Sequence, residues 1–213
     1  MMINEDMLLA RGAVYKKIKK NDFIFKEGTA CNYYYQLVEG KVNWLNYDTD
    51  GKLFIHMIIH PGECFGELPL FDAEPYAATA LADSDAVILQ LPKVTFHELL
   101  KENQELVQAF AMLFAQRIRY QFFIIKEIAQ HNPEHKIISI LNFFKQRYPI
   151  DDNNGWYKIN FTRQQIAGMT GLRIETVIRV IRKLNESGKL IINKGKVFLP
   201  TNNTDINHAT IVF

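Results

Sequence analysis

The segment of residues 161–184 constrains the fold of this chain most strongly, because it predicts two helices joined by a glycine turn at Gly171. The second of these helices has two different faces. Apolar side chains recur at three- and four-residue spacing on one face, at Val177, Val180, Ile181 and Leu184. The same spacing on another side carries Glu175, Ile178, Arg179 and Arg182. We therefore expect the first face to pack inside the protein and the second to stay exposed.

The exposed face carries two side chains that suit a DNA-binding helix. An arginine can donate two hydrogen bonds to O6 and N7 of guanine, and a glutamate can accept one from N4 of cytosine. Arg179 and Glu175 stand four residues apart, which matches one G·C pair in the major groove. Thr162 is the expected N-cap of the first helix, and with Arg163 and Gln164 it is expected to face phosphate. The remaining predicted DNA contacts are Arg173, Ile174, Thr176, Ile178, Arg182 and Lys196.

The positive charge of the chain is concentrated around this two-helix motif. Residues 156–200 carry nine lysines and arginines against two glutamates, a net charge of +7, although the whole chain carries only +2. Residues 1–155 carry 16 basic and 20 acidic side chains, a net charge of −4. A basic surface can be merely solvated, but its coincidence with the motif favours contact with DNA phosphates.

Composition and cysteine content argue against several other classes of protein. The 213 residues are 48% apolar and 23% charged, which is typical of a soluble protein with a buried core. No apolar run approaches about 18 residues and no secretion signal is present, so we expect a cytoplasmic protein without a membrane span. Cys31 and Cys64 are too few for a disulfide scaffold or a four-thiolate cluster, and we expect two reduced, partly buried thiols. No nucleophile–base pair, metal motif or phosphate-binding glycine loop indicates an enzyme.

The first part of the chain is predicted to be an antiparallel β-barrel of the jelly-roll type. Short apolar stretches lie at residues 23–25, 33–38, 42–45, 54–59 and 86–91. Glycine-containing turns separate these stretches, and Asp50 followed by Gly51 is typical of a hairpin turn. Strands of this length with turns at this spacing are typical of barrels and jelly rolls.

A long helix is predicted after the strands, because residues 93–132 contain neither glycine nor proline. One stripe along it comprises Leu106, Phe110, Leu113, Arg117, Tyr120 and Ile124. A neighbouring stripe comprises Val107, Phe114, Ile118, Ile125 and Ala129. Because the helix is apolar on two sides, we expect one stripe to cover the barrel and the first-named stripe to pair with a second copy of the chain. Burial of the whole helix within one chain is the alternative.

Pro133 interrupts the helical pattern and is expected to separate two domains. The first domain, residues 1–132, would contain the barrel and the long helix at about 97–131. The second, residues 133–213, would contain another helix, the two-helix motif, a basic hairpin turning at residues 194–196 and a C-terminal tail. A hairpin directly after the second helix defines a winged helix-turn-helix. The predicted fold class is therefore α+β.

This order of barrel, long helix and winged helix-turn-helix resembles the Crp/Fnr family of bacterial transcription regulators over nearly the whole chain. The DNA-binding motif lies at residues 162–167 with Gly171, Glu175, Thr176, Val177 and Arg179. Residues 61–68 and 75–80 resemble the phosphate-binding cassette of cyclic-nucleotide-binding domains. The resemblance implies a homodimer that binds a two-fold symmetric site on double-stranded DNA and recruits RNA polymerase.

The cassette departs from that of family members that bind cyclic AMP. In those members an arginine after the cassette proline binds the cyclic phosphate, whereas Tyr76 follows Pro75 here. The two hydroxyl residues that contact adenine from the long helix are replaced by Gln121 and Phe122. Loss of a hydrogen bond to a charged group costs about 1.5–3 kcal/mol, so we expect that neither cyclic AMP nor cyclic GMP binds. The other residues of the predicted effector pocket are Gly66, Glu67, Leu68 and Ala77.

The sequence does not identify a ligand for the cassette. Gly66 and Glu67 could serve only the backbone turn, or the pocket could bind an unidentified small effector. The oxygen-sensing members of the family carry a cysteine cluster near the start of the chain, which is missing here, so we do not expect an iron–sulfur centre. Haem ligation is disfavoured because a lone histidine is seldom a ligand, and it would fall to one of His56, His60, His97, His131 and His135. We therefore predict no cofactor or metal.

The DNA-binding face resembles the Fnr branch of the family. Ile174 precedes Glu175, where the cyclic-AMP-binding members have an arginine. We expect half-sites closer to TTGA than to TGTGA, with a thymine methyl in reach of Ile174 or Ile178. The predicted function is a sequence-specific transcription regulator. The alternative is a cyclic-nucleotide or other small-ligand-binding module whose winged helix mediates protein contacts.

Overall fold

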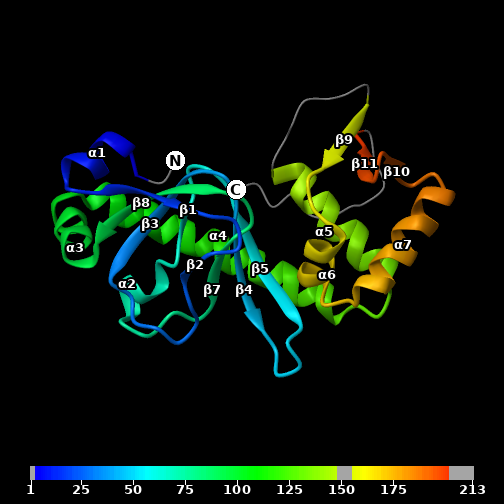
Figure 1. The fold of residues 1–213 in the computed structure, drawn as a ribbon, viewed down its shortest axis with the longest axis horizontal. Coiled ribbons are helices and arrows are strands. Elements are labelled where there is room, and N and C mark those ends of the chain that lie inside the picture. The colour runs from blue at the N-terminus through cyan, green and yellow to red at the C-terminus, as the bar shows by residue number, and fades with distance from the viewer. Residues whose placement is uncertain (1–2, 148–154, 202–213) are drawn as a thin grey trace. The chain divides into compact units, whose positions relative to one another are not determined.

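The computed structural model describes residues 3–147 and 155–201, and the chain forms two compact units, Met1–Phe114 and Ala115–Phe213 (Figure 1). This boundary falls within the long helix. The helix break that the sequence places at Pro133 lies inside the second unit, because the later part of the long helix packs with the helix that follows it. The predicted role of the C-terminal tail falls on residues 202–213, which lie outside the described residues.

Two four-stranded antiparallel sheets build the first unit, which confirms the jelly-roll prediction. One sheet has the order β1-β8-β3-β6, with strands Val14–Ile18, Ala86–Pro92, Tyr33–Glu39 and Cys64–Phe65. The other has the order β2-β7-β4-β5, with strands Phe23–Phe25, Thr79–Ala82, Val42–Tyr47 and Leu53–Ile59. Strands β4 and β5 pair across the predicted turn at Gly51. The sequence did not predict β1, which lies at a sheet edge and exposes all its side chains except Ile18.

The first unit also contains three short helices, α1 (Glu5–Ala10), α2 (Leu68–Asp72) and α3 (Lys93–Glu102). Helix α1 lies beside α3 in Figure 1, and Arg11 at the end of α1 forms an ion pair with Glu102. Helix α3 buries Phe96 and Leu99. Cys31 and Cys64 are both buried and do not form a disulfide.

The long helix, α4, spans Gln104–Ala129 and does not begin near residue 97 as predicted. Asn103 ends α3 with a non-helical backbone (φ −131°, ψ 87°), and its side-chain Nδ2 donates to the carbonyl oxygen of Leu99 at 2.8 Å. This local bond competes with the helical hydrogen-bond pattern and separates α3 from α4. Hydrophobic periodicity alone did not reveal the break, because asparagine interrupts a helix less visibly than proline.

The two stripes of α4 differ from the predicted assignment. Phe110, Tyr120 and Ile124, which were assigned to pairing, are 0–3% exposed within the single chain. Phe110 contacts the rings of Tyr34 and Phe96 in the first unit, and Tyr120 contacts Phe143 in the second. Leu106, Leu113 and Arg117 are half-buried. Val107, Ile118 and Ile125 of the neighbouring stripe are 45–62% exposed, and Phe122, which belongs to neither predicted stripe, is 67% exposed beside them.

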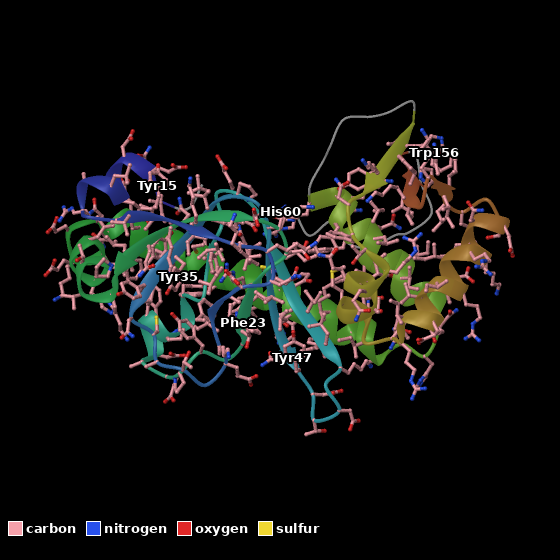
Figure 2. The ribbon with its side chains drawn as sticks, in the orientation of Figure 1. Tyr15, Phe23, Tyr35, Tyr47, His60 and Trp156 are labelled. Carbon is pink, nitrogen blue, oxygen red and sulfur yellow. The ribbon has the colours of Figure 1, made fainter. Side chains whose placement is uncertain are left out.

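The second unit contains three further helices and a small antiparallel sheet. The helices are α5 (Pro133–Arg147), α6 (Arg163–Thr170) and α7 (Ile174–Glu186). The sheet has the order β10-β11-β9, with strands Ile191–Asn193, Lys196–Pro200 and Trp156–Ile159. The predicted basic hairpin is β10–β11, and it turns at Lys194 and Gly195, whose φ angles are +45° and +75°. Two positive φ angles are typical of a tight hairpin turn. Strand β9, labelled by Trp156 in Figure 2, was not predicted.

No helix within residues 3–147 and 155–201 is long and apolar enough to cross a membrane.

Candidate nucleic-acid interface and sensor cassette

Thr162 is the N-cap of α6, which begins at Arg163, and this confirms the predicted N-cap. The Thr162 hydroxyl accepts a hydrogen bond from the backbone N–H of Gln165 at 3.1 Å, and the Thr162 N–H donates to Gln165 Oε1 at 2.8 Å. This reciprocal capping box satisfies two N–H groups at the helix start. The side chains of Thr162 and Gln164 are exposed and Arg163 is half-buried, and this burial lowers the pKa of the Arg163 guanidinium.

A left-handed glycine ends α6 and sets up the turn into α7. Gly171 has φ +68°, and a Cβ added there would meet no atom within 4 Å. Glycine is therefore required by the backbone conformation alone. The buried hydroxyl of Thr170 donates to the carbonyl oxygen of Ile166 at 2.7 Å and fixes the last turn of α6.

Helix α7 has the two faces that the sequence predicted. Its buried residues are Val177, Val180, Ile181 and Leu184. On the opposite side Glu175, Arg179 and Arg182 are exposed, and Ile178 is 42% exposed. We call Glu175, Ile178, Arg179 and Arg182 the exposed face of α7. Around it, Arg173 is exposed at the N-cap, Ile174 and Thr176 are half-buried, and Lys196 is exposed at the start of β11.

Two polar contacts that the sequence did not predict connect elements of the second unit that are far apart in sequence. The carboxylate of Glu134, at the start of α5, contacts Lys189 Nζ at 2.6 Å and Lys183 Nζ at 3.6 Å. The hydrogen bond from Lys189 holds the pKa of Glu134 below its usual value. Lys145 of α5 donates to the carbonyl oxygens of Pro200 and Thr201 at 2.5 and 3.1 Å. These contacts fix α5 to the end of α7 and to the last residues of the hairpin.

Aromatic rings fill the interior of the cassette in the first unit. Tyr76 is 3% exposed and stacks on Phe25, with ring centroids 3.8 Å apart and planes at 9°. Tyr35, labelled in Figure 2, stacks on Phe25 and Phe65 at 5.7 and 5.6 Å. Gly66 has φ +68°, and a Cβ there would lie 2.4 Å from Cζ of Phe25. The ring of Phe25 thus occupies the space beside the glycine of the cassette.

The polar groups of this aromatic cluster are neutral phenols. The Tyr76 hydroxyl donates to Sγ of Cys31 at 3.1 Å. Burial raises the pKa of Tyr35 to about 12, and burial together with the bond to Cys31 raises the pKa of Tyr76 above its ordinary value. Both side chains are therefore uncharged at neutral pH, and Tyr76 cannot replace the positive charge of an arginine.

Of the predicted effector-pocket residues that lie in the first unit, Tyr76 lines a recess there, and Gly66, Glu67, Leu68 and Ala77 are not among the residues that line it. This recess of about 360 Å³ lies beside the cluster and is lined by Tyr76 together with Phe25, Tyr33 and Tyr35. Glu67 is fully buried at the N-cap of α2, whereas Leu68 is 37% exposed and Ala77 is exposed. The other two predicted residues lie on α4 in the second unit, with Gln121 half-buried and Phe122 67% exposed.

The histidines show no metal-binding arrangement in the part of the chain that the structure describes, since no three His, Cys, Asp or Glu side chains gather there. His56 contacts Asn46 through Nε2, and burial lowers its pKa. His135 lies 3.3 Å from a carboxylate oxygen of Glu127 and 3.3 Å from the hydroxyl of Ser139.

Comparison with known proteins connects both regions to one family. Residues 15–103 match the cyclic nucleotide-binding domain, and residues 136–200 match the Crp-like helix-turn-helix domain. The chain belongs to the Crp/Fnr family. It is therefore a transcription regulator and not an enzyme.

Individual relatives in the Crp/Fnr family extend over most of the chain. The cAMP-activated global transcriptional regulator Vfr of Pseudomonas aeruginosa is 27% identical over 199 residues, which cover 91% of this chain and 92% of Vfr. The Anaerobic regulatory protein of Bacillus subtilis is 25% identical over 203 residues, which cover 93% of this chain and 85% of that protein. The structure of the c-di-GMP responsive regulator CLP of Xanthomonas campestris has a TM-score of 0.80 at 15% identity, covering 93% of this chain and 100% of CLP.

The name of one of the two sequence relatives refers to cyclic AMP and that of the other to anaerobic regulation. Membership of the Crp/Fnr family therefore identifies the DNA-binding output of the chain without identifying its input. Any inference about a ligand of the first unit therefore depends on the side chains of the cassette.

Proposed function

We propose that this Crp/Fnr regulator acts in the bacterial cytoplasm as a homodimer on two-fold symmetric DNA sites, contacts RNA polymerase, and does not bind cyclic AMP. The exposed face of α7 is the observation that carries the DNA-binding part of the proposal. Glu175 and Arg179 extend from a helix whose opposite side is fully packed, so the helix can enter the major groove without losing its core. Arg179 would donate to guanine and Glu175 would accept from the paired cytosine.

Pairing of two copies is supported by the exposed stripe of α4. Val107, Ile118, Phe122 and Ile125 recur at helical spacing and are 45–67% exposed. Contact with the same stripe of a second copy would remove this apolar surface from water. A two-fold pair of α7 helices would then match two half-sites about one turn of DNA apart.

Exclusion of cyclic nucleotides is supported by the aromatic cluster of the cassette. Tyr76 carries no positive charge, and the ring of Phe25 lies against both Tyr76 and Gly66. A cyclic phosphate would therefore lack a cation and would also have to displace a packed ring. No cofactor is required by this proposal, and any effector would have a chemistry other than that of cyclic AMP.

Selection of binding sites from randomised DNA tests the DNA-binding part directly. Arg179→Ala should weaken binding to the selected site by about 1–3 kcal/mol and relax the preference at one base pair. Arg163→Ala should weaken all sequences alike, since Arg163 is assigned to phosphate. Equal effects of both substitutions on the selected sequence would contradict these roles. Binding that does not depend on salt would favour the alternative in which the winged helix contacts protein.

Two solution measurements test the remaining parts. Titration calorimetry with cyclic AMP and with cyclic GMP should show no heat of binding, and micromolar affinity for either would contradict the proposal. Sedimentation velocity should show a dimer that Ile118→Asp converts to monomer, because a carboxylate would be buried at the pairing surface. Phe110→Leu, a substitution in the intrachain core, should leave the dimer intact.

A further inference from the structure

We propose that Glu127 and His135 form a proton-dependent contact that fixes the end of α4 to the start of α5 at acidic and neutral pH and weakens at alkaline pH. Glu127 lies in the last turn of α4, and His135 lies in the first turn of α5. Both residues belong to the second unit. We call the segment from Glu127 to Ser139 the α4–α5 corner.

Glu127 carries a buried carboxylate that needs a proton or a positive charge beside it. Its side chain is 0% exposed, and neither of its oxygens accepts a hydrogen bond within residues 3–147 and 155–201. A buried charge without such partners is strongly unfavourable. One carboxylate oxygen lies 3.3 Å from Nε2 of His135, whose side chain is 40% exposed. The stability of the corner therefore depends on the proton that this pair holds.

Two neighbours of Nε2 of His135 match its two protonation states. A protonated Nε2 can donate to Glu127, whereas an unprotonated Nε2 can accept from the hydroxyl of Ser139, which also lies 3.3 Å away. With one proton on the pair, either the imidazolium compensates the carboxylate or both groups are neutral. Without that proton, the carboxylate is buried beside a neutral imidazole. Loss of a single proton thus makes the contact unfavourable.

A second contact keeps the two helices joined when the pair releases its proton. Lys136 Nζ donates to the carbonyl oxygen of Ile128, in the last turn of α4, at 2.7 Å. Lysine remains charged at moderately alkaline pH, so this hydrogen bond does not depend on His135. Release of the proton should therefore weaken the corner without separating α4 from α5.

Histidine is the side chain of this region that ordinarily titrates near neutral pH, whereas glutamate, lysine and arginine ordinarily titrate outside the range from pH 6 to pH 8.5. His131 is the other histidine of the corner, and it is exposed. The remaining charged residues are Lys126 on α4, Glu134 and Lys136 on α5, and, from the elements that pack against α5, Arg163 on α6, Lys158 on β9, Glu175, Arg179, Arg182, Lys183 and Glu186 on α7, and Lys189 after α7.

The corner connects two surfaces of the proposed regulator. Helix α5 packs against α6 and α7. Ile118, Phe122 and Ile125 of the exposed stripe lie on the part of α4 that belongs to the same unit. In a dimer paired through this stripe, the corner would set the spacing of the two α7 helices. A weaker corner should then lower the affinity for a two-fold symmetric site, a consequence that rests on the proposed function.

Thermal unfolding between pH 6 and pH 8.5 tests the contact, with Trp156 as the reporter in a Trp44→Phe background. The folded pair should bind its proton more tightly than the unfolded chain, whose histidines release theirs near about pH 6.5, so stability is present at low pH and lost as pH rises. The unfolding midpoint should fall by about 4–8 °C across this range. Glu127→Gln, which keeps the size of the side chain and removes its charge, should be nearly independent of pH.

Two further variants separate the pair from other effects of pH. His135→Gln leaves the carboxylate without its partner, so its midpoint should already be lowered at pH 6 and should change little on going to pH 8.5. His131→Gln is the matched control and should keep the wild-type pH dependence. The proposal is overturned if Glu127→Gln retains the wild-type pH dependence, or if His131→Gln loses it.

DNA binding at fixed salt tests the consequence for regulation. Between pH 6 and pH 8.5 the wild type should lose about 3- to 10-fold more affinity for a selected site than Glu127→Gln does. Equal losses would overturn the link from the corner to DNA binding. Failure of the proposed function gives a different result, in which no protein prefers any DNA sequence at either pH.

Discussion

The cassette and the helix-turn-helix both have the backbone turn of a binding motif. They differ in the side chains around that turn, which fill the space in the cassette and leave it open in the helix-turn-helix. Gly66 and Gly171 have the same φ of +68°, and each forms a turn that its motif requires. Beside Gly171 the space is open and the exposed face of α7 remains accessible. Beside Gly66 the ring of Phe25 fills the space and stacks on Tyr76. A motif in the sequence thus indicates a backbone conformation, whereas the surrounding side chains decide whether a ligand can enter.

The largest expected effect comes from returning a cation to the cassette. Tyr76→Arg should lower the free energy of unfolding of the first unit by about 3–5 kcal/mol, because it buries an unpaired charge among aromatic rings. It should not confer binding of cyclic AMP, since Phe25 remains in place. Urea unfolding can follow this unit alone in a Trp156→Phe background, where Trp44 is the remaining tryptophan.

Tyr76→Phe is the control for this substitution. It keeps the stacked ring and loses only the hydrogen bond to Cys31, so its effect should be about 1 kcal/mol. A Tyr76→Arg protein that is as stable as the wild type and binds cyclic AMP would show that the cassette is closer to a nucleotide site than the aromatic packing indicates.

The two glycines give a matched pair with the next largest effects. Gly171→Ala should destabilise the second unit by about 1–2 kcal/mol, which is the conformational cost of a left-handed alanine. Gly66→Ala adds a clash with Phe25 at 2.4 Å, so the first unit should lose about 1–3 kcal/mol more than that. Urea unfolding with Trp156 and Trp44 as separate reporters measures the two losses. Equal losses would mean that the packing around Gly66 adjusts without strain.

The smallest expected effect is a pH dependence confined to the second unit. The bond from Lys189 holds the pKa of Glu134 below its ordinary value, so the folded state favours the carboxylate. The resulting stability is present above the unfolded pKa of about 4.3 and is lost as pH falls through the folded pKa. Because these charges are near the surface, the change should be below about 1 kcal/mol. The free energy of unfolding of Glu134→Gln, measured from unfolding curves, should lack this pH dependence between about pH 5 and pH 3. If the variant kept the wild-type pH dependence, Glu134 would not be its cause.

The features that sequence predicted well are local ones. The capping box of Thr162, the turn at Gly171 and the two faces of α7 each depend on residues within a few positions, so spacing and side-chain chemistry are sufficient. The roles of the two stripes on α4 were not predictable in this way. Both stripes are apolar with the same period, and only the positions of Tyr34, Phe96 and Phe143 in space show which one is covered.

The cassette was predicted only in part for a related reason. The exchange of an arginine for Tyr76 is visible in the sequence, but its stacking on Phe25 depends on a strand far away along the chain. The contact of Glu134 with Lys189 is equally distant in sequence and left no local signal. Asn103 shows the same limit at a helix end, where one side-chain hydrogen bond outweighs helical periodicity.

Because both cysteines are buried, their reaction with a thiol reagent can report on opening of the first unit. Cys31 and Cys64 are 8% and 1% exposed, both lie in the first unit, and the chain has no other thiol. Cys64 is almost completely buried, so a thiol reagent under native conditions labels it when that unit opens, and the labelling rate of Cys64 measures the opening equilibrium. Any molecule that binds the closed sensor must slow this rate in proportion to its affinity. Thiol labelling can thus screen candidate small molecules for binding to the first unit before any target gene is known.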